Sequence, residues 1–232
     1  MYRYETHLHT SPVSACATAG VRETLEFYKT LGYDGVFITN HSFIGGNINI
    51  SYGTPYKERV EFFFSDYEQA KELEDEIGIK VFSGVEISYG GTDFLVYGLD
   101  KQWFLENPQI ADMRMSEKLA FFMEAGALVI HAHPFLEARY IDHIRLFPRH
   151  VHGVEVFNAC KNDFQNGLAM QYAQNYELAL FAGSDNHAAA GVRRLGGIEC
   201  ELPIENEREL KALLLDGKIN IFNMKNPLRE DE

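Results

Sequence analysis

Histidines and carboxylates gather in five short segments of this 232-residue chain, and each segment follows a run of apolar residues. The segments are His7-Leu-His9, Asn40-His41, Glu86, His131-Ala-His133-Pro134 and Gly183-Ser-Asp185-Asn-His187. Imidazole nitrogens and carboxylate oxygens are ligands for divalent transition metals. Side chains alternate between the two faces of a strand, so His7 and His9 point the same way and can chelate one ion. Such residues serve metal-assisted hydrolysis, in which an ion lowers the pKa of water to about 7 and stabilises a leaving oxygen.

Each of these segments also has an ordinary interpretation. Two exposed histidines at the end of a strand are common, Glu86 could be a solvated carboxylate, and the Asp185 segment could form an Asx turn. His143, His150 and His152 lie in a region that contains Arg and Pro, and we interpret them as surface residues. The placement of all five segments at strand ends favours metal binding over these alternatives.

The five segments belong to a regular alternation of helices and strands. Apolar residues at helical spacing end at Gly32, Gly78, Gly126 and Gly217, and a glycine just beyond a helix supplies its left-handed cap. A short apolar strand follows each of these glycines, and 153–157 and 178–181 are two more strands around a helix near 163–177. Such alternation is typical of a parallel sheet buried on both faces. We count about seven strands and expect an α/β fold, a nearly closed barrel with its active site at the carboxyl ends of the strands.

The remaining segments give the expected boundaries. No Pro-, Ser- or Gly-rich linker divides the sequence, so we expect one domain over residues 1–232. Ser65 and Glu68 have capping-box spacing, which predicts a helix beginning at Ser65. Residues 43–60 are expected to form a long loop over the active-site rim, and residues 205–232 a C-terminal helix and tail.

The composition limits the class of partner and the compartment. A formal net charge of −13 and a pI of about 5.1 disfavour nucleic acid, whose binding needs a basic surface. Three dispersed cysteines predict neither a disulfide framework nor a zinc knuckle. The N-terminus lacks the apolar core of a signal peptide and no apolar run approaches ~20 residues, so we expect a cytoplasmic protein with no membrane partner.

The order of the five segments closely resembles that of the PHP (polymerase and histidinol phosphatase) superfamily. The resemblance runs from residue 5 to about 190 and implies a distorted (β/α)7 barrel. It further implies two to three divalent ions (Zn, Mn or Fe) and hydrolysis of a small-molecule phosphate monoester or diester by a metal-activated hydroxide. By the same resemblance, the first metal would be held by His7, His9, Glu86 and Asp185, the second by Glu86 and His133, and the third by His41 and His187.

Several positions depart from the family's pattern. Asn40 replaces an Asp before the second-motif histidine, and Asp93 replaces a histidine often found on the strand after Glu86. An Asp can still bind a borderline ion, so Asp93 stays a candidate ligand of the metals. The stretch after the first motif offers only Ser14 or Cys16 as a further ligand of the third metal. The sequence therefore predicts two metal sites and leaves the third open.

The roles of the remaining polar residues have alternatives. His187 or His131 is the expected proton donor. Arg193 and Arg194 follow the last motif, where they could supply paired donors to a phosphate or could be solvated loop residues.

Two other functions stay open at this stage. An amidohydrolase-type barrel that cleaves C–N bonds also opens with His-x-His, but it usually bridges its metals through a modified lysine, and no strand-end lysine is evident. The second alternative is a non-catalytic, regulatory metal-binding module, which the altered third metal site and Asn40 keep open.

Overall fold

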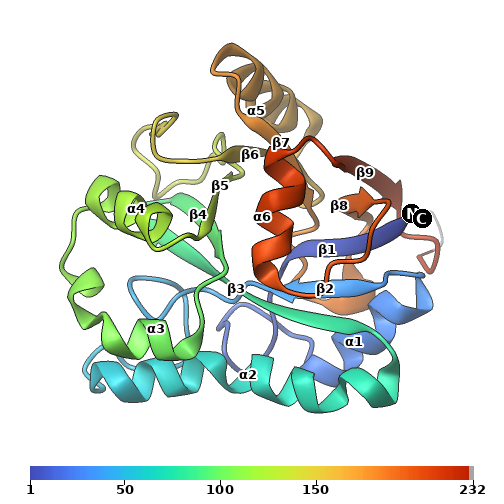
Figure 1. Cartoon of the computed structure of the whole chain (residues 1–232), viewed down its shortest axis with the longest axis horizontal. Helices are drawn as coiled ribbons and strands as arrows, with labels where there is room; N and C mark the ends of the chain where they lie inside the picture. The colour runs from blue at the N-terminus through green and yellow to red at the C-terminus, as the bar shows by residue number, and fades with distance from the viewer. Residues whose placement is uncertain (230–232) are drawn as a thin grey trace.

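The computed structural model of the chain describes residues 1–229, in which nine strands form one continuous sheet (Figure 1). The last three residues of the predicted C-terminal tail, 230–232, lie outside the described residues. The strands are β1 (Tyr2–Leu8), β2 (Gly35–Ile38), β3 (Lys80–Tyr89), β4 (Thr92–Tyr97), β5 (Leu128–Ala132), β6 (Gly153–Asn158), β7 (Ala179–Gly183), β8 (Arg194–Cys200) and β9 (Ile219–Lys225). The helices are α1 (Val21–Thr30), α2 (Tyr56–Ile77), α3 (Lys101–Glu106), α4 (Met115–Glu124), α5 (Asp163–Asn175) and α6 (Glu207–Leu215), with short 3₁₀ helices at Pro108–Ala111 and Ala189–Gly191.

The sheet curls into the nearly closed barrel that the sequence predicts. Its strand order is β7-β6-β5-β4-β3-β2-β1-β8-β9, and β1 to β3 and β5 to β7 pair in parallel. A parallel bridge between Leu8 and Asn186 joins the end of β1 to the residues that follow β7. The carboxyl ends of β1, β2, β3, β5 and β7 therefore meet at one rim.

The prediction of an all-parallel sheet was wrong for β4, β8 and β9. β4 is antiparallel to both β3 and β5, and β8 pairs antiparallel with β1 and β9. Two residues, Gly90 and Gly91, join β3 to β4 with φ of 56° and 84°, which suits a tight hairpin between antiparallel strands. A parallel connection would have needed a crossover of a dozen or more residues.

Apolar side chains fill the barrel interior, and α6 closes the end away from the rim. Tyr97, Leu128 and Phe181 pack there with Leu210 and Leu214 of α6. The ammonium of Lys211 donates to the carbonyl oxygens that immediately precede β5. Figure 1 shows α6 lying across the strands. One end of the barrel is thus filled, and the polar residues are left at the other end.

The long helix α2 begins earlier than the sequence predicts. Residues 56–60, assigned to a loop, are its first turn, so the loop after β2 ends at Pro55. Ser65 lies inside the helix, where its hydroxyl donates to the backbone oxygen of Phe62 instead of capping an N-terminus. Burial of Val60, Phe63 and Phe64 against the sheet extends the helix through a stretch with weak sequence periodicity. Among the described residues, no helix combines the length and apolar character that crossing a membrane requires.

Candidate metal centre

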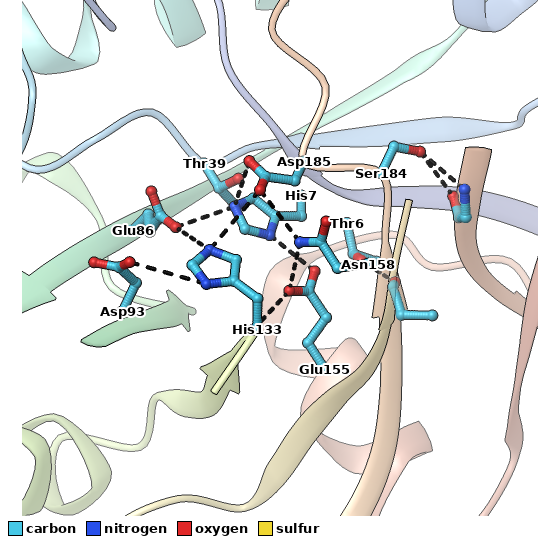
Figure 2. Close-up of polar contacts among 12 residues, drawn as sticks. Thr6, His7, Thr39, Glu86, Asp93, His133, Glu155, Asn158, Ser184 and Asp185 are labelled. Carbon is cyan, nitrogen blue, oxygen red and sulfur yellow. Dashed lines mark hydrogen bonds and ion pairs between the residues drawn. The ribbon is translucent and has the colours of Figure 1, made fainter. Parts of the chain in front are cut away.

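The rim of the barrel brings the predicted ligands of the first and second metals together. His7 lies at the end of β1, Glu86 on β3, His133 just beyond β5, and Asp185 just beyond β7. These side chains, with His9, are buried and point toward one another; Figure 2 shows all of them except His9. Strand pairing also aligns His41 with Glu86, because a parallel bridge joins these two residues just beyond β2.

The first group has the spacing that one ion imposes on its ligands. His7 Nε2 lies 3.3 Å from Glu86 Oε1 and 3.6 Å from Asp185 Oδ1, and His9 Nε2 lies 3.5 Å from Asp185 Oδ1. Two atoms each about 2.1 Å from a tetrahedral ion lie about 3.4 Å apart. The Nε2 atoms of both histidines are buried and have no hydrogen-bond partner within residues 1–229. Buried polar atoms without partners are costly, and a divalent ion between them would satisfy both.

Glu86 stands between this group and the second one. Its Oε1 lies 3.3 Å from His7 Nε2 and 3.2 Å from His133 Nε2, whereas its Oε2 lies 2.5 Å from His41 Nδ1. His7, Glu86 and His133 have ligand atoms that all lie within 4.8 Å of one another. This is the arrangement of a carboxylate that bridges neighbouring ions.

A third group consists of histidines, with a thiol beside it. His9, His41 and His187 offer atoms within 4.8 Å of one another, and the His9 ring stacks on His187 at a centroid distance of 4.1 Å. Cys16 Sγ lies 3.1 Å from His41 Nε2. Burial raises the pKa of the Cys16 thiol, but hydrogen bonds from His187 and His41 outweigh it and lower that pKa to about 6. The thiolate is therefore the donor available to complete this group.

The charge states of the carboxylates and of His9 suit metal ligands. Burial alone would raise the pKa of the Glu86 carboxyl, but His41 and His133 hold it well below its usual range. Burial would also raise the pKa of the Asp185 carboxyl, but His7 and Lys161 hold it well below its usual range. Burial and the neighbouring His187 lower the pKa of His9, so its imidazole is neutral. Ionised carboxylates and neutral imidazoles are the forms that bind divalent metals. Against burial, the neighbouring carboxylates raise the pKa of His7, and Glu86 and Cys16 raise that of His41 to about 10, so a bound ion would displace a proton from each.

A second layer of buried groups orients these ligands, and sequence reasoning missed it. Glu155 on β6, fully buried, accepts a hydrogen bond from His7 Nδ1 at 2.8 Å through Oε1. Its Oε2 accepts from the His133 backbone N–H at 3.0 Å and from Asn158 Nδ2 at 2.9 Å. A carboxylate behind a metal-binding histidine fixes its tautomer and raises its basicity. Glu155 is thus a positioning residue for two histidines at once (Figure 2).

Asn40, which departs from the family's pattern, helps to position His9 through Ser14. Its Oδ1 accepts hydrogen bonds from the Ser14 hydroxyl at 2.8 Å and from the Thr10 backbone N–H at 2.7 Å. Its Nδ2 donates to Asp66 Oδ2 at 3.2 Å. Ser14 Oγ in turn lies 3.2 Å from His9 Nδ1, so Ser14 lies behind His9 and not in the third group.

Lys161 is a cation beside the cluster that sequence reasoning also missed. It follows β6, and its Nζ lies 2.7 Å from Asp185 Oδ2. The expectation of no strand-end lysine was therefore wrong. The signal was present, because Lys161 follows a short apolar strand just as the five ligand segments do.

The other predicted site residues lie outside the ligand groups. His131 faces the opposite side of β5, stacked on Phe94 at 4.8 Å, and burial lowers its pKa to about 3. Asp93 Oδ2 lies behind His133, 4.0 Å from its Nδ1. Arg194 donates to Asp163 and to two backbone oxygens of the loop after β6, and Arg193 is exposed. Of these four residues, only Asp93 approaches one of the clustered ligands.

The chain is similar in sequence to one curated protein over less than half of its length. No protein-family model matches the chain. An uncharacterised protein of Methanocaldococcus jannaschii is 35% identical over 112 residues, which cover 45% of this chain and 45% of that protein. The matched segment thus spans less than half of that relative.

Three solved structures are similar over most of the chain. A two-domain protein from Bacteroides vulgatus, containing a predicted PHP-like metal-dependent phosphoesterase, has a TM-score of 0.67 and 16% identity over 95% of this chain and 64% of that one. A predicted metal-dependent phosphoesterase from Bifidobacterium adolescentis has a TM-score of 0.53 and 16% identity over 80% of this chain and 88% of that one. An amidohydrolase from Chromobacterium violaceum, with bound sulfate and no metal, has a TM-score of 0.55 and 15% identity over 94% of this chain and 97% of that one. At such identities the similarity shows the fold, and the PHP-like fold that the motifs predict is confirmed.

Proposed function

We propose that this chain is a metal-dependent hydrolase that cleaves a phosphate ester of a small molecule. The observation that carries the proposal is the convergence of buried His7, His9, Glu86, His133 and Asp185 with unpartnered imidazole nitrogens. His7, His9, Asp185 and Glu86 would hold one ion, Glu86 and His133 a second, and His9, His41 and His187 are the candidates for a third. Bound ions there supply Lewis acidity, which makes water nucleophilic near neutral pH and stabilises a leaving oxygen.

The chain's own groups fit a phosphate in three ways. Lys161 adds a positive charge beside Asp185, where an anionic ester would bind. His187 donates from Nδ1 to the Asp185 backbone oxygen at 2.9 Å, which leaves Nε2 to act either as a ligand or as the proton donor to a leaving group. Its side chain is 26% exposed, so a substrate can reach it. Glu155 and Ser14 hold the His7 and His9 rings in place before a substrate arrives.

Hydrolysis of a C–N bond is the second candidate, because one similar fold belongs to an amidohydrolase and a lysine lies beside Asp185. The position of that lysine favours the phosphoesterase. Lys161 pairs with one oxygen of Asp185, while Glu86 takes the position between the two groups of histidines that a bridging lysine would need.

The test is a turnover panel on protein loaded with Zn, Mn or Fe. It contains phosphate monoesters, phosphate diesters, and linear and cyclic amides. Asp185→Asn keeps the shape of the side chain and removes a charged ligand, so phosphoesterase turnover should fall at least about 100-fold. Asp216→Asn, on the exposed end of α6, is the matched control and should leave turnover unchanged.

Each outcome of this panel decides between the candidates. Cleavage of phosphate esters that depends on Asp185 supports the proposal. Turnover of amides alone would favour the second candidate, and tightly bound metal with no turnover in either class would favour a regulatory module.

A further inference from the structure

A cavity of about 680 Å³ lies at the end of β3, two residues beyond Glu86. Its walls come from Ile44 and Gly45 after β2, from Ser88 and Tyr89 at the end of β3, from residues 111–118 and from Phe147. Ile44 and Phe147 belong to the two long segments that follow β2 and β5, the strands that lead to His41 and His133. The cavity is therefore formed by the same connections that deliver the metal ligands.

A lysine that forms no ion pair with the described residues lines this cavity. Lys118 on α4 is only 5% exposed, and its neighbours on the buried face of that helix are apolar: Met115, Leu119 and Phe122. Its ammonium makes no hydrogen bond or ion pair with the described residues. The neighbouring Asp112 carboxylate acts on its charge, but Asp112 is exposed and forms no ion pair with Lys118, so the ammonium faces the cavity without a close counter-ion.

The surroundings of Lys118 favour an anion. Arg114 and Ser116 line the same cavity, at the first turn of the ten-residue helix α4, where the helix dipole also attracts negative charge. Asp112, which is exposed, is the one carboxylate in the cavity wall, against the two cations. Burial lowers the pKa of the Lys118 ammonium, and a bound anion would oppose that shift.

The wall of the cavity approaches the metal centre at Ser88. Ser88 lies two residues beyond Glu86 on the same face of β3, a separation of about 7 Å along the strand. The Ser88 side chain interacts with the Asp93 carboxylate, which lies 4.0 Å from His133 Nδ1. A ligand group at Glu86 would thus lie about 7 Å from the cavity wall at Ser88, and a flexible spacer would carry a second group into the cavity that Lys118 lines.

We propose that this cavity binds a second acidic group of the substrate, a phosphate or carboxylate, and that Lys118 is its counter-ion. The inference rests on the proposed function, since it assigns a substrate class to that site: small phosphate esters that carry another anionic group at the far end of a short chain. Lys118 is a specificity residue in this account and takes no part in the bond cleavage.

The experiment compares two series of substrates on the metal-loaded protein. One series is the bisphosphates of straight-chain diols from ethane to hexane, and the other is the alkyl monophosphates of equal length. The bisphosphates should show a length optimum, with kcat/KM at least about tenfold above that of the matching monophosphate. Lys118→Met should raise KM for the best bisphosphate by at least about tenfold and leave both kcat and the monophosphates unchanged.

Two further variants guard against a folding effect. Lys118→Arg keeps the positive charge and should keep the preference for bisphosphates. Lys57→Met, which removes an exposed lysine of α2, should change neither series. Equal loss in both series, or no loss for Lys118→Met, would overturn the assignment.

Failure of this inference is separable from failure of the proposed function. If no ester is turned over, the proposed function fails, and calorimetry with hexane-1,6-bisphosphate and the shorter homologues still tests the cavity. Binding that weakens at least about tenfold in Lys118→Met but not in Lys57→Met supports an anion site. Equal affinities in the two variants would overturn it.

Discussion

The most informative single substitution is Glu155→Gln, because it changes one charge and no shape behind the metal centre. Three donors converge on this carboxylate: His7 Nδ1–H at 2.8 Å, the His133 backbone N–H at 3.0 Å and Asn158 Nδ2–H at 2.9 Å. The carboxylate accepts all three through its two oxygens. A glutamine offers one oxygen and an NH₂ group, so in either orientation at least one donor faces another donor.

The expected loss of metal affinity follows from the hydrogen bonds that His7 and His133 lose in Glu155→Gln. Charge-assisted hydrogen bonds contribute about 1.5–3 kcal/mol, and loss of such a partner behind a metal-binding histidine lowers metal affinity by about 10- to 100-fold. Metal that binds only the folded chain stabilises it by RT ln(1 + [L]/Kd). At a fixed excess of metal, the stabilisation of Glu155→Gln should therefore fall short of the wild-type value by about 1.4–2.7 kcal/mol.

The assay is competition for Zn or Mn against a coloured chelator, together with thermal unfolding with and without metal. Glu199→Gln is the matched control, because Glu199 lies on β8 and its partner is the half-exposed Arg3. It should change metal affinity by less than a factor of two, as surface pairs contribute about 0–1 kcal/mol. Equal metal affinities for Glu155→Gln and wild type would refute the idea that Glu155 positions the ligands.

Three further predictions concern the third site, the core and pH. Cobalt-loaded protein should show a thiolate-to-cobalt charge-transfer band in the near ultraviolet that Cys16→Ser lacks, and identical spectra would remove the thiol from the third site. Gly183→Ala should lose about 1–3 kcal/mol in urea unfolding and bind metal more weakly, because its new Cβ would lie 2.5 Å from His7 Cβ; unchanged stability would contradict this close packing. Burial and Lys211 lower the pKa of His152 to about 4, below the ordinary value of 6.5. Its neutral form thus stabilises the fold above pH 6.5, and that stability is lost as pH falls toward 4. Between pH 7 and pH 5 the loss is about 1 kcal/mol after discounting for partial solvent exposure. His152→Asn, which can still accept from the Val129 backbone N–H, should lack this loss, and an equal loss in the variant would contradict the assignment.

The ligands were predictable from the sequence because their chemistry and their place after apolar strands are both local signals. His7, His9, His133 and Asp185 end or follow a strand and Glu86 lies near the end of one, and parallel pairing brings these strand ends to one rim. No contact between them had to be known in advance.

The supporting residues were not predictable in the same way. Glu155 lies inside the strand Gly153–Asn158 and acquires its role by facing His7, which is 148 positions away in the chain. Its neighbours Val154 and Val156 make the segment look like an ordinary buried strand. Asp66 joins the network behind His9 from the middle of α2, where nothing in the local sequence distinguishes it from a solvated carboxylate.

The errors in the fold have local physical causes. The Gly90-Gly91 pair is typical of an antiparallel hairpin, but the alternation of helices and strands elsewhere in the chain favoured a parallel sheet. β8 begins at Arg194 and contains Gly196 and Gly197, residues typical of loops. Gly196 is required there because a Cβ would lie 2.8 Å from the Phe157 ring, and this close packing cannot be seen in the sequence.

We propose that His7, His9, Glu86, His133 and Asp185 form a centre for at least two metal ions. Elemental analysis of protein purified without added metal, repeated after incubation with Zn, Mn and Fe and removal of the excess, tests it most directly. We expect two or three ions per wild-type chain and a loss of at least one in Asp185→Asn. Fewer than one ion per chain under all these conditions, in folded protein, would contradict it.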